Sequence, residues 1–129
     1  MTVAVNVDEL NRIARELVAP EKGILAADES TGTIKRRLDA ISVENTEENR
    51  RDYRELLFRT PEAEKYISGV ILFDETIRQK GADGTPLVKL LTDRGIIPGI
   101  KVDKSTHALP FSPEEKMTEG LDGLRDRLK

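Results

Sequence analysis

Three runs of apolar residues, without the alternation typical of a half-exposed strand, recur along the chain. They occupy residues 23–28, 67–74 and 96–103, and each run ends at an acidic residue. Unbroken apolar runs are typical of strands that are covered on both faces, as the strands of parallel sheets are. Pro98 and Gly99 predict an irregular start for the third strand. The pattern therefore predicts three buried parallel strands.

Apolar residues at helical spacing recur in the sequence between and around these runs. One such helix begins at Asn45 or Thr46, because Asn45 and Glu48 have the spacing of a capping box. Tyr53, Leu56 and Leu57 should form its inner face. Its solvated side should carry Glu47, Glu48, Arg50, Arg51 and Asp52. The helices predicted in this way span residues 8–20, 34–41, 45–57, 60–66, 85–95 and 117–128, with a loop over residues 105–117.

Alternating strands and helices predict parallel pairing through right-handed crossovers, so all three strands should end at one edge of the sheet. That edge is where open α/β sheets and barrels build their sites. Asp28, Lys101 and Asp103 stand at or beside strand ends. We therefore expect these three side chains to lie at the same edge, with strand ends two spacings apart separated by roughly 10 Å.

Composition narrows the classes of protein and site. The chain has 129 residues, well short of the ~250 that a complete (β/α)8 barrel needs. A net charge of −3 argues against nucleic-acid binding and against a polybasic membrane contact. With no cysteine and a single histidine, thiolate and imidazole-cluster metal sites are excluded. No signal peptide or membrane span is recognisable, so we expect a cytoplasmic protein without a metal or cofactor.

The segment after Asp28 has two interpretations. Ser30 and Thr33 offer hydroxyls that cap a helix, and the first turn of that helix is basic, through Arg37. Cations are unfavourable at a helix N-terminus, whereas free N–H groups beside an arginine suit a phosphate. The other interpretation is an ordinary capped helix with solvated charges. Neither a Walker pattern nor GxGxxG is present to decide between them.

Two further side chains are chemical candidates. Lys101, at a strand end among apolar neighbours, is the residue that chemistry alone selects as an imine-forming amine. The alternative is that Lys101 pairs with Asp28 or Asp103, and this pairing is favoured because several carboxylates lie close by. His107 falls in the predicted loop without a carboxylate or serine partner, which favours a surface histidine over a general base.

Five segments resemble, in order and spacing, the amino-terminal part of class I fructose-bisphosphate aldolases. They read KGILAADESTGTIKRRL, ENTEENRRDYRELLF, GVILFDETI, GIKVDKS and EGLDGLRDRLK, and the resemblance runs from about Leu10 to Lys129. It implies a (β/α)8 TIM barrel, usually a homotetramer, without metal or other cofactor. The implied reaction is glycolytic: reversible cleavage of fructose 1,6-bisphosphate to glyceraldehyde 3-phosphate and dihydroxyacetone phosphate through a lysine Schiff base.

The matching motifs also imply roles for individual residues. By this resemblance, Asp28 is the acid/base carboxylate, Ser30 and Thr33 lie at the substrate, and Arg37 binds a substrate phosphate. Lys101 contacts the substrate rather than forming the imine. The resemblance therefore overturns the choice of Lys101 that chemistry alone favours.

The sequence departs from the family pattern at several points. Thr33 stands where many relatives have serine, Ser105 stands where glycine is usual, and residues 106–117 lack the familiar form of that loop. The chain should be the amino-terminal part of one TIM-barrel domain, its first three strands with flanking helices and no internal boundary over residues 1–129. The family's imine-forming lysine is expected beyond Lys129, so this chain alone should be inactive. The alternative is a non-enzymatic phosphate-binding or interaction module.

Overall fold

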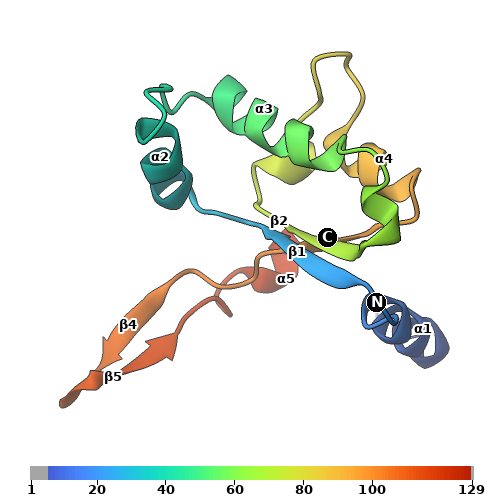
Figure 1. Ribbon diagram of the computed structural model, residues 1–129. Helices are drawn as coiled ribbons and strands as arrows, with labels where there is room; N and C mark the ends of the chain where they lie inside the picture. The colour runs from blue at the N-terminus through green and yellow to red at the C-terminus, as the bar shows by residue number, and fades with distance from the viewer. Residues whose placement is uncertain (1–5, 129) are drawn as a thin grey trace.

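A three-stranded parallel sheet forms the centre of the molecule in a computed structural model that describes residues 6–128 (Figure 1). Its strands are β1 (Gly23–Ala27), β2 (Ile67–Leu72) and β3 (Ile97–Ile100), in the order β1-β2-β3. The predicted parallel sheet is therefore confirmed. The strands are shorter than the apolar runs, because β2 ends before Phe73 and β3 ends before Lys101.

The register makes the three strands end level with one another. Leu72 in the central strand is opposite Ala27 of β1 and opposite Ile100 of β3. The backbone N–H of Lys101 then donates to the Leu72 carbonyl at 2.9 Å, which carries the pairing one residue further. The residues that follow each strand therefore begin at the same edge of the sheet.

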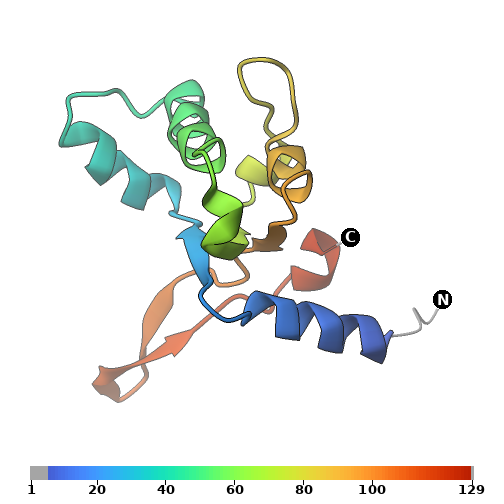
Figure 2. The ribbon, with the colours of Figure 1, turned by 45° about the vertical axis from the view of Figure 1, so that its right-hand side comes forward.

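Helices cover the two faces of the sheet unequally. The helices are α1 (Val7–Leu17), α2 (Thr31–Asp39), α3 (Glu47–Phe58), α4 (Leu87–Thr92) and α5 (Leu124–Arg127), with 3-10 turns η1 (Ala63–Lys65) and η2 (Thr76–Arg78). Both α3 and α4 lie over one face, and α1 lies on the other side of the sheet (Figures 1 and 2). There the side chain of Leu17 packs directly against Gly69.

The core lies between the sheet and the pair α3 and α4. Its buried members are Ala27, Phe58, Val70, Leu72, Leu87, Leu91 and Ile96. On the opposite face of β1, Ile24 is 47 % exposed and Ala26 is also exposed. The apolar runs predict strands covered on both faces, but the described residues cover only one face of β1.

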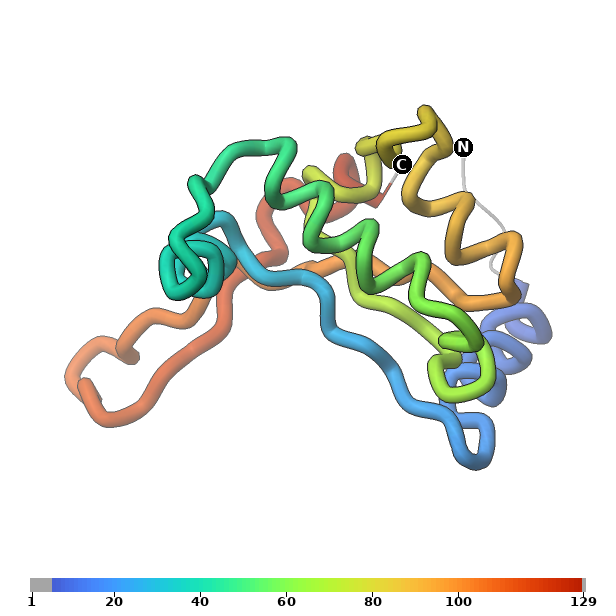
Figure 3. Tube along the Cα trace, turned by 45° about the horizontal axis from the view of Figure 1, so that its top comes forward, coloured from blue at the N-terminus to red at the C-terminus, as the bar shows by residue number. Residues whose placement is uncertain are grey.

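The predicted loop at 105–117 and the predicted helix from Met117 are both wrong. Strands β4 (Thr106–Leu109) and β5 (Ser112–Thr118) form an antiparallel hairpin that extends away from the sheet (Figure 3). The last helix, α5, begins only at Leu124. Gly120 and Gly123 have positive φ angles of 151° and 71°, which a continuous right-handed helix excludes.

Other helix boundaries differ by smaller amounts. The helix predicted for residues 60–66 is a single 3-10 turn, because Glu62 has a left-handed backbone with φ 60°. Thr46 is the N-cap of α3, and its side chain accepts a 3.1 Å hydrogen bond from the Asn49 N–H. Thr46 rather than Asn45 therefore starts that helix. Among residues 6–128, the helices are too short or too polar to cross a membrane.

Candidate functional site

The edge formed by the strand ends brings Asp28 and Lys101 together. The Lys101 ammonium donates to Asp28 Oδ2 at 3.2 Å, and its Nζ lies 2.8 Å from Asp103 Oδ1. Asp28 follows β1 and Lys101 follows β3, so both side chains reach over the end of the central strand. The prediction that these groups share one edge is confirmed.

Both carboxylates keep Lys101 in its charged form. The hydrogen bond to Asp103 raises the pKa of Lys101, and Asp28 adds to this rise against the opposing effect of burial. Lys101 in turn lowers the pKa of Asp103, with help from the Ser105 N–H, which donates to that carboxylate at 3.2 Å. The pairing interpretation is therefore confirmed, and a protonated Lys101 is a poor nucleophile.

A pocket of about 490 Å³ opens beside this charged group. Its lining comprises Ser30, Thr33, Phe73, Asp74, Lys101, Asp103, Lys104, Ser105 and Arg127. Arg127 of α5 donates to the Lys101 carbonyl at 2.5 Å, which joins the last helix to the end of β3. Three cationic residues, Lys101, Lys104 and Arg127, share the lining with the carboxylates of Asp74 and Asp103, so the lining carries a small excess of positive charge.

The start of α2 supplies hydroxyls to the same pocket. Ser30 is the N-cap residue, but its side chain makes no capping hydrogen bond. Instead, Ser30 Oγ and Thr33 Oγ1 lie 3.2 Å apart as a hydrogen-bonded pair. Since each hydroxyl both donates and accepts, the pair retains hydrogen-bonding capacity for a ligand. Ser30, Thr33, Asp28 and Lys101 are thus brought together.

Arg37 is placed elsewhere. It is in α2, but its guanidinium donates to the carboxylate of Glu29 and, at 2.6 Å, to the hydroxyl of Tyr53. The Tyr53 hydrogen bond and, after it, the charge of Glu29 raise the pKa of Arg37. Its side chain is 54 % exposed, and it does not line the pocket beside Lys101. Its expected contact with a phosphate stays a prediction.

Two charged residues of α3 that the sequence pattern does not assign to its inner face, Arg54 and Glu55, are buried. The face of α3 turned to the core carries Arg54, Glu55 and Phe58, whereas Leu56 is 72 % exposed. The predicted inner face of Leu56 and Leu57 is therefore wrong in part. A signal was present, because Arg54 precedes Phe58 by one helical turn and so shares its face.

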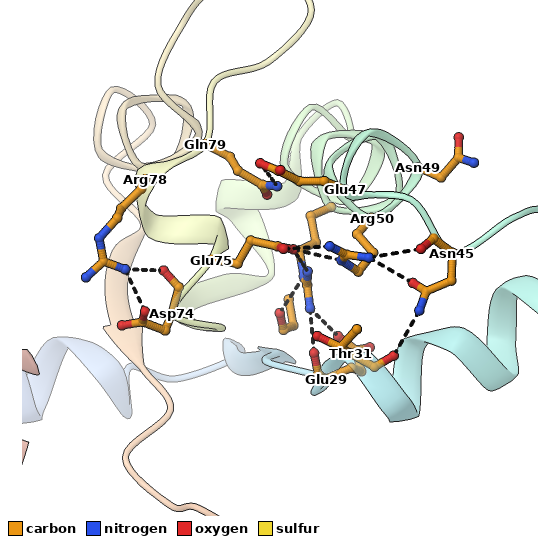
Figure 4. Close-up of polar contacts among 12 residues, drawn as sticks. Glu29, Thr31, Asn45, Glu47, Asn49, Arg50, Asp74, Glu75, Arg78 and Gln79 are labelled. Atoms are coloured by element: carbon orange, nitrogen blue, oxygen red, sulfur yellow. Dashed lines mark hydrogen bonds and ion pairs between the residues drawn. The ribbon is translucent and has the colours of Figure 1, made fainter.

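Arg50, one turn before Arg54, belongs to the same group. Its guanidinium forms a two-pronged contact with Glu75, at 2.8 and 2.7 Å, and also donates to the carbonyl and side-chain oxygens of Asn45 (Figure 4). Its side chain is only 11 % exposed, so the expected solvated position is wrong. This ion pair ties α3 to the segment that follows β2.

His107 has a partner that the sequence does not indicate. It lies in β4, with Nε2 3.6 Å from Glu119 Oε2, and both side chains are about half exposed. The predicted absence of a carboxylate neighbour is wrong, while the surface position is confirmed. In the part of the chain that the structure describes, no group of three or more histidine, cysteine, aspartate or glutamate residues is placed to hold a metal ion.

Comparisons with known proteins all indicate the same protein family. The family described as glycolytic, fructose-bisphosphate aldolase class-I, matches residues 9–129. A probable fructose-bisphosphate aldolase class 1 of Xanthomonas campestris is 59 % identical over 124 residues, and fructose-bisphosphate aldolase 1 of Toxoplasma gondii is 61 % identical over 121. These alignments cover 96 % and 94 % of this chain.

A solved structure is also similar in fold. The fructose-bisphosphate aldolase of Plasmodium falciparum, in complex with TRAP and a small-molecule inhibitor, superposes with a TM-score of 0.90 at 57 % identity. The superposition covers 95 % of this chain and 35 % of the Plasmodium chain. The alignments cover 37 % of the Xanthomonas protein and 33 % of the Toxoplasma protein, so the chain spans about a third of these relatives' length.

Proposed function

The chain belongs to the class I fructose-bisphosphate aldolase family, and we propose that its pocket at the strand ends is part of an aldolase active site. The reaction is the reversible cleavage of fructose 1,6-bisphosphate into glyceraldehyde 3-phosphate and dihydroxyacetone phosphate through a lysine Schiff base. The observation that carries this proposal is the Asp28, Lys101 and Asp103 group beside a pocket lined by hydroxyls and cations. The lysine that forms the imine is not Lys101.

Asp28 is the acid/base group in this proposal. Its carboxylate already accepts a hydrogen bond from an ammonium at 3.2 Å, the geometry in which a carboxylate exchanges a proton with a nitrogen or a hydroxyl. Lys101 stays charged through its stronger contact with Asp103, so it stabilises the Asp28 anion and contacts substrate oxygens as a cation. In this division of roles, Asp28 transfers protons and Lys101 binds the substrate electrostatically.

The remaining residues bind the substrate. Ser30 and Thr33 donate from the start of α2 to a substrate oxygen, and Lys101 supplies positive charge on the same pocket. Arg37 binds a phosphate after it leaves Glu29 and Tyr53. Arg37 is 54 % exposed but Glu29 is only 7 % exposed, so its departure leaves a largely buried carboxylate, which the nearby charge of Arg54 compensates in part.

At the level of the whole protein, the three parallel strands and their helices are the first part of one (β/α)8 barrel domain without an internal boundary. The full-length enzyme is proposed to be a cytoplasmic homotetramer. An Arabidopsis thaliana relative that is 59 % identical over 122 residues is named as a cytosolic aldolase, which supports the compartment.

A chimaera tests the proposal. Residues 10–128 of this chain would replace the matching segment of the Xanthomonas campestris relative, and cleavage of fructose 1,6-bisphosphate would be measured. We expect an active enzyme in which Asp28→Ala lowers kcat by at least ~10²-fold. The matched control His107→Ala should leave kcat unchanged, because His107 lies on the exposed hairpin.

The same measurement distinguishes the alternative function. A folded but inactive chimaera, with sugar-phosphate binding retained by the chain itself, would refute the aldolase role. That result would instead favour a non-enzymatic phosphate-binding module. Equal losses for Asp28→Ala and His107→Ala would refute the role assigned to Asp28.

A further inference from the structure

Arg54 is a fully buried cation that the proposed reaction does not use. It lies in α3, and its side chain has no exposed surface. Its Nε donates to the Ala27 carbonyl at 3.2 Å, and its Nη2 donates to the Glu29 carbonyl at 2.6 Å. The two acceptors are the backbone groups of the residues on either side of Asp28.

The position of Asp28 explains why such a contact matters. Ala27 is the last residue of β1, so strand pairing fixes the backbone up to Ala27 and no further. The guanidinium is a planar fork whose donors have fixed relative positions. Because the fork holds the carbonyls before and after Asp28, it fixes the backbone of Asp28. The position of the Asp28 carboxylate relative to Lys101 depends on that backbone.

The same guanidinium also contacts a wall of the pocket. Its central carbon lies 5.6 Å from the centre of the Phe73 ring, within the range of a cation–π contact, and Phe73 lines the pocket beside Lys101. Glu29 and Glu75 each place a carboxylate oxygen 3.9 Å from a terminal nitrogen of Arg54. One cation thus connects α3, the end of β1 and the end of β2.

The energetics do not favour stability as the reason for this arrangement. Burial lowers the pKa of Arg54, which reflects the cost of placing the charge away from water. Nη1 of Arg54 and Oε2 of Glu29 are buried without a hydrogen-bond partner among the described residues. A buried ion pair is often replaceable by apolar residues when both partners change together, whereas removal of one partner destabilises the fold, so Arg54→Met should also lower stability.

We propose that Arg54 is a positioning residue that holds Asp28 against Lys101. Its importance for the reaction rests on the proposed function, but the positioning itself is measurable without a substrate. Loss of the fork should let the Asp28 segment move, so that Lys101 loses one of its two carboxylate partners while Asp103 remains.

The test uses Arg54→Met and Arg54→Lys in the chimaera with the Xanthomonas campestris relative. Methionine removes the charge and the donors at similar length, whereas lysine keeps the charge but has no rigid fork. Arg94→Met is the matched control. Arg94 also bridges two carbonyls two residues apart, donating to Phe58 at 2.9 Å and to Thr60 at 2.8 Å, at the carboxyl end of α3.

The readout is acetylation of Lys101 as a function of pH, followed by mass spectrometry with the exposed Lys22 as internal reference. The half-labelling pH is the pH at which half of Lys101 is acetylated. Asp28→Asn serves as the reference, because its shift in half-labelling pH corresponds to full loss of the Asp28 contact. We expect Arg54→Met to lower the half-labelling pH by most of that shift and Arg54→Lys to lower it by part. Arg94→Met should leave it unchanged.

The double variant Arg54→Met with Asp28→Asn decides between positioning and a general effect. If Arg54 acts through Asp28, the double variant should shift no further than Asp28→Asn alone. Additive shifts, an equal shift in Arg94→Met, or an unshifted Lys101 in the folded Arg54 variants would overturn the proposal. Unfolding of both Arg54 variants would also overturn it, because Arg54 would then be a structural residue.

The labelling result is separable from the proposed function. If the chain failed to bind fructose 1,6-bisphosphate and the chimaera failed to cleave it, the proposed function would fall, while the Lys101 shifts would still report on Arg54. Conversely, an active chimaera with unshifted Lys101 would retain the function and reject the positioning role.

Discussion

Replacement of Gly69 by alanine should separate α1 from the sheet. A Cβ at this position would lie 2.4 Å from Leu17 Cδ2 and 3.2 Å from the Ile97 carbonyl oxygen. Carbon atoms in contact prefer ~3.5–4.0 Å, so the Leu17 methyl must move by about 1 Å or more. The Ile97 oxygen belongs to the backbone of β3 and cannot move away as easily.

The size of the effect follows from how little else holds α1. None of its residues is buried, and its described hydrogen bond to the sheet is the 2.6 Å donation from Ser68 Oγ to the Leu17 carbonyl. Overpacking of this kind costs ~1–3 kcal/mol. We expect Gly69→Ala to lower the free energy of unfolding by that amount and to speed hydrogen exchange in α1.

Urea unfolding of the chimaera with the Xanthomonas campestris relative, followed by circular dichroism, together with hydrogen exchange, measures both effects. Gly99→Ala in β3 is the matched control, because its Cβ would meet only the Val70 carbonyl oxygen at an ordinary 3.6 Å. Leu17→Ala should cost less in the Gly69→Ala background than in the wild type, since it removes the clash. Strictly additive losses, or equal losses for the two glycine variants, would refute the reasoning.

Three further predictions concern the open edges of the sheet, Lys101 and Glu75. The isolated chain should associate or partly unfold, because β1 and β3 are open edges and Ile24 is exposed beside them; a compact monomer with a cooperative melt in sedimentation and calorimetry would contradict this. It should form no borohydride-trapped adduct with dihydroxyacetone phosphate, since Asp103 and Asp28 raise the pKa of Lys101; a stoichiometric adduct mapped to Lys101 would refute the pairing. Arg50 lowers the pKa of Glu75 below its ordinary 4.5, so this contribution to stability is present above that value and is lost as pH falls through the lowered pKa. In the chimaera, Glu75→Gln should therefore remove about 2 kcal/mol of stability at pH 7 and flatten the decline of stability below pH 4.5. Asp83, whose pKa the Thr85 N–H lowers to about 2, stays ionised over most of that range. An unchanged acid profile in urea titrations would count against the role of Glu75.

The sheet and its functional edge could be predicted from the sequence because both depend on simple periodicity. Three apolar runs separated by helical segments allow little besides parallel strands, and parallel strands place Asp28 and Lys101 at one edge. The pairing of Lys101 with carboxylates follows from the same topology. These features depend on residue type and order more than on the detail of packing.

The buried face of α3 could not be predicted in the same way. The apolar pattern of α3 does not assign Arg54 and Glu55 to its inner face, whereas the fold buries them against backbone groups of distant segments. Whether a cation finds such partners depends on loops whose paths the sequence pattern does not specify. The same limit applies to Arg37, whose contacts with Glu29 and Tyr53 depend on the angle between α2 and α3.

The level ends of β1, β2 and β3 also bear on how the sheet grows during synthesis. Strand order equals chain order, so β2 pairs with a strand that has already emerged, and β3 then adds to the edge that β2 leaves open. No earlier strand has to be displaced to admit a later one. The sheet can therefore form one strand at a time during synthesis. Asp28 is in place at the edge of the sheet before β3 is made, and the pairing of β3 then brings Lys101 next to it.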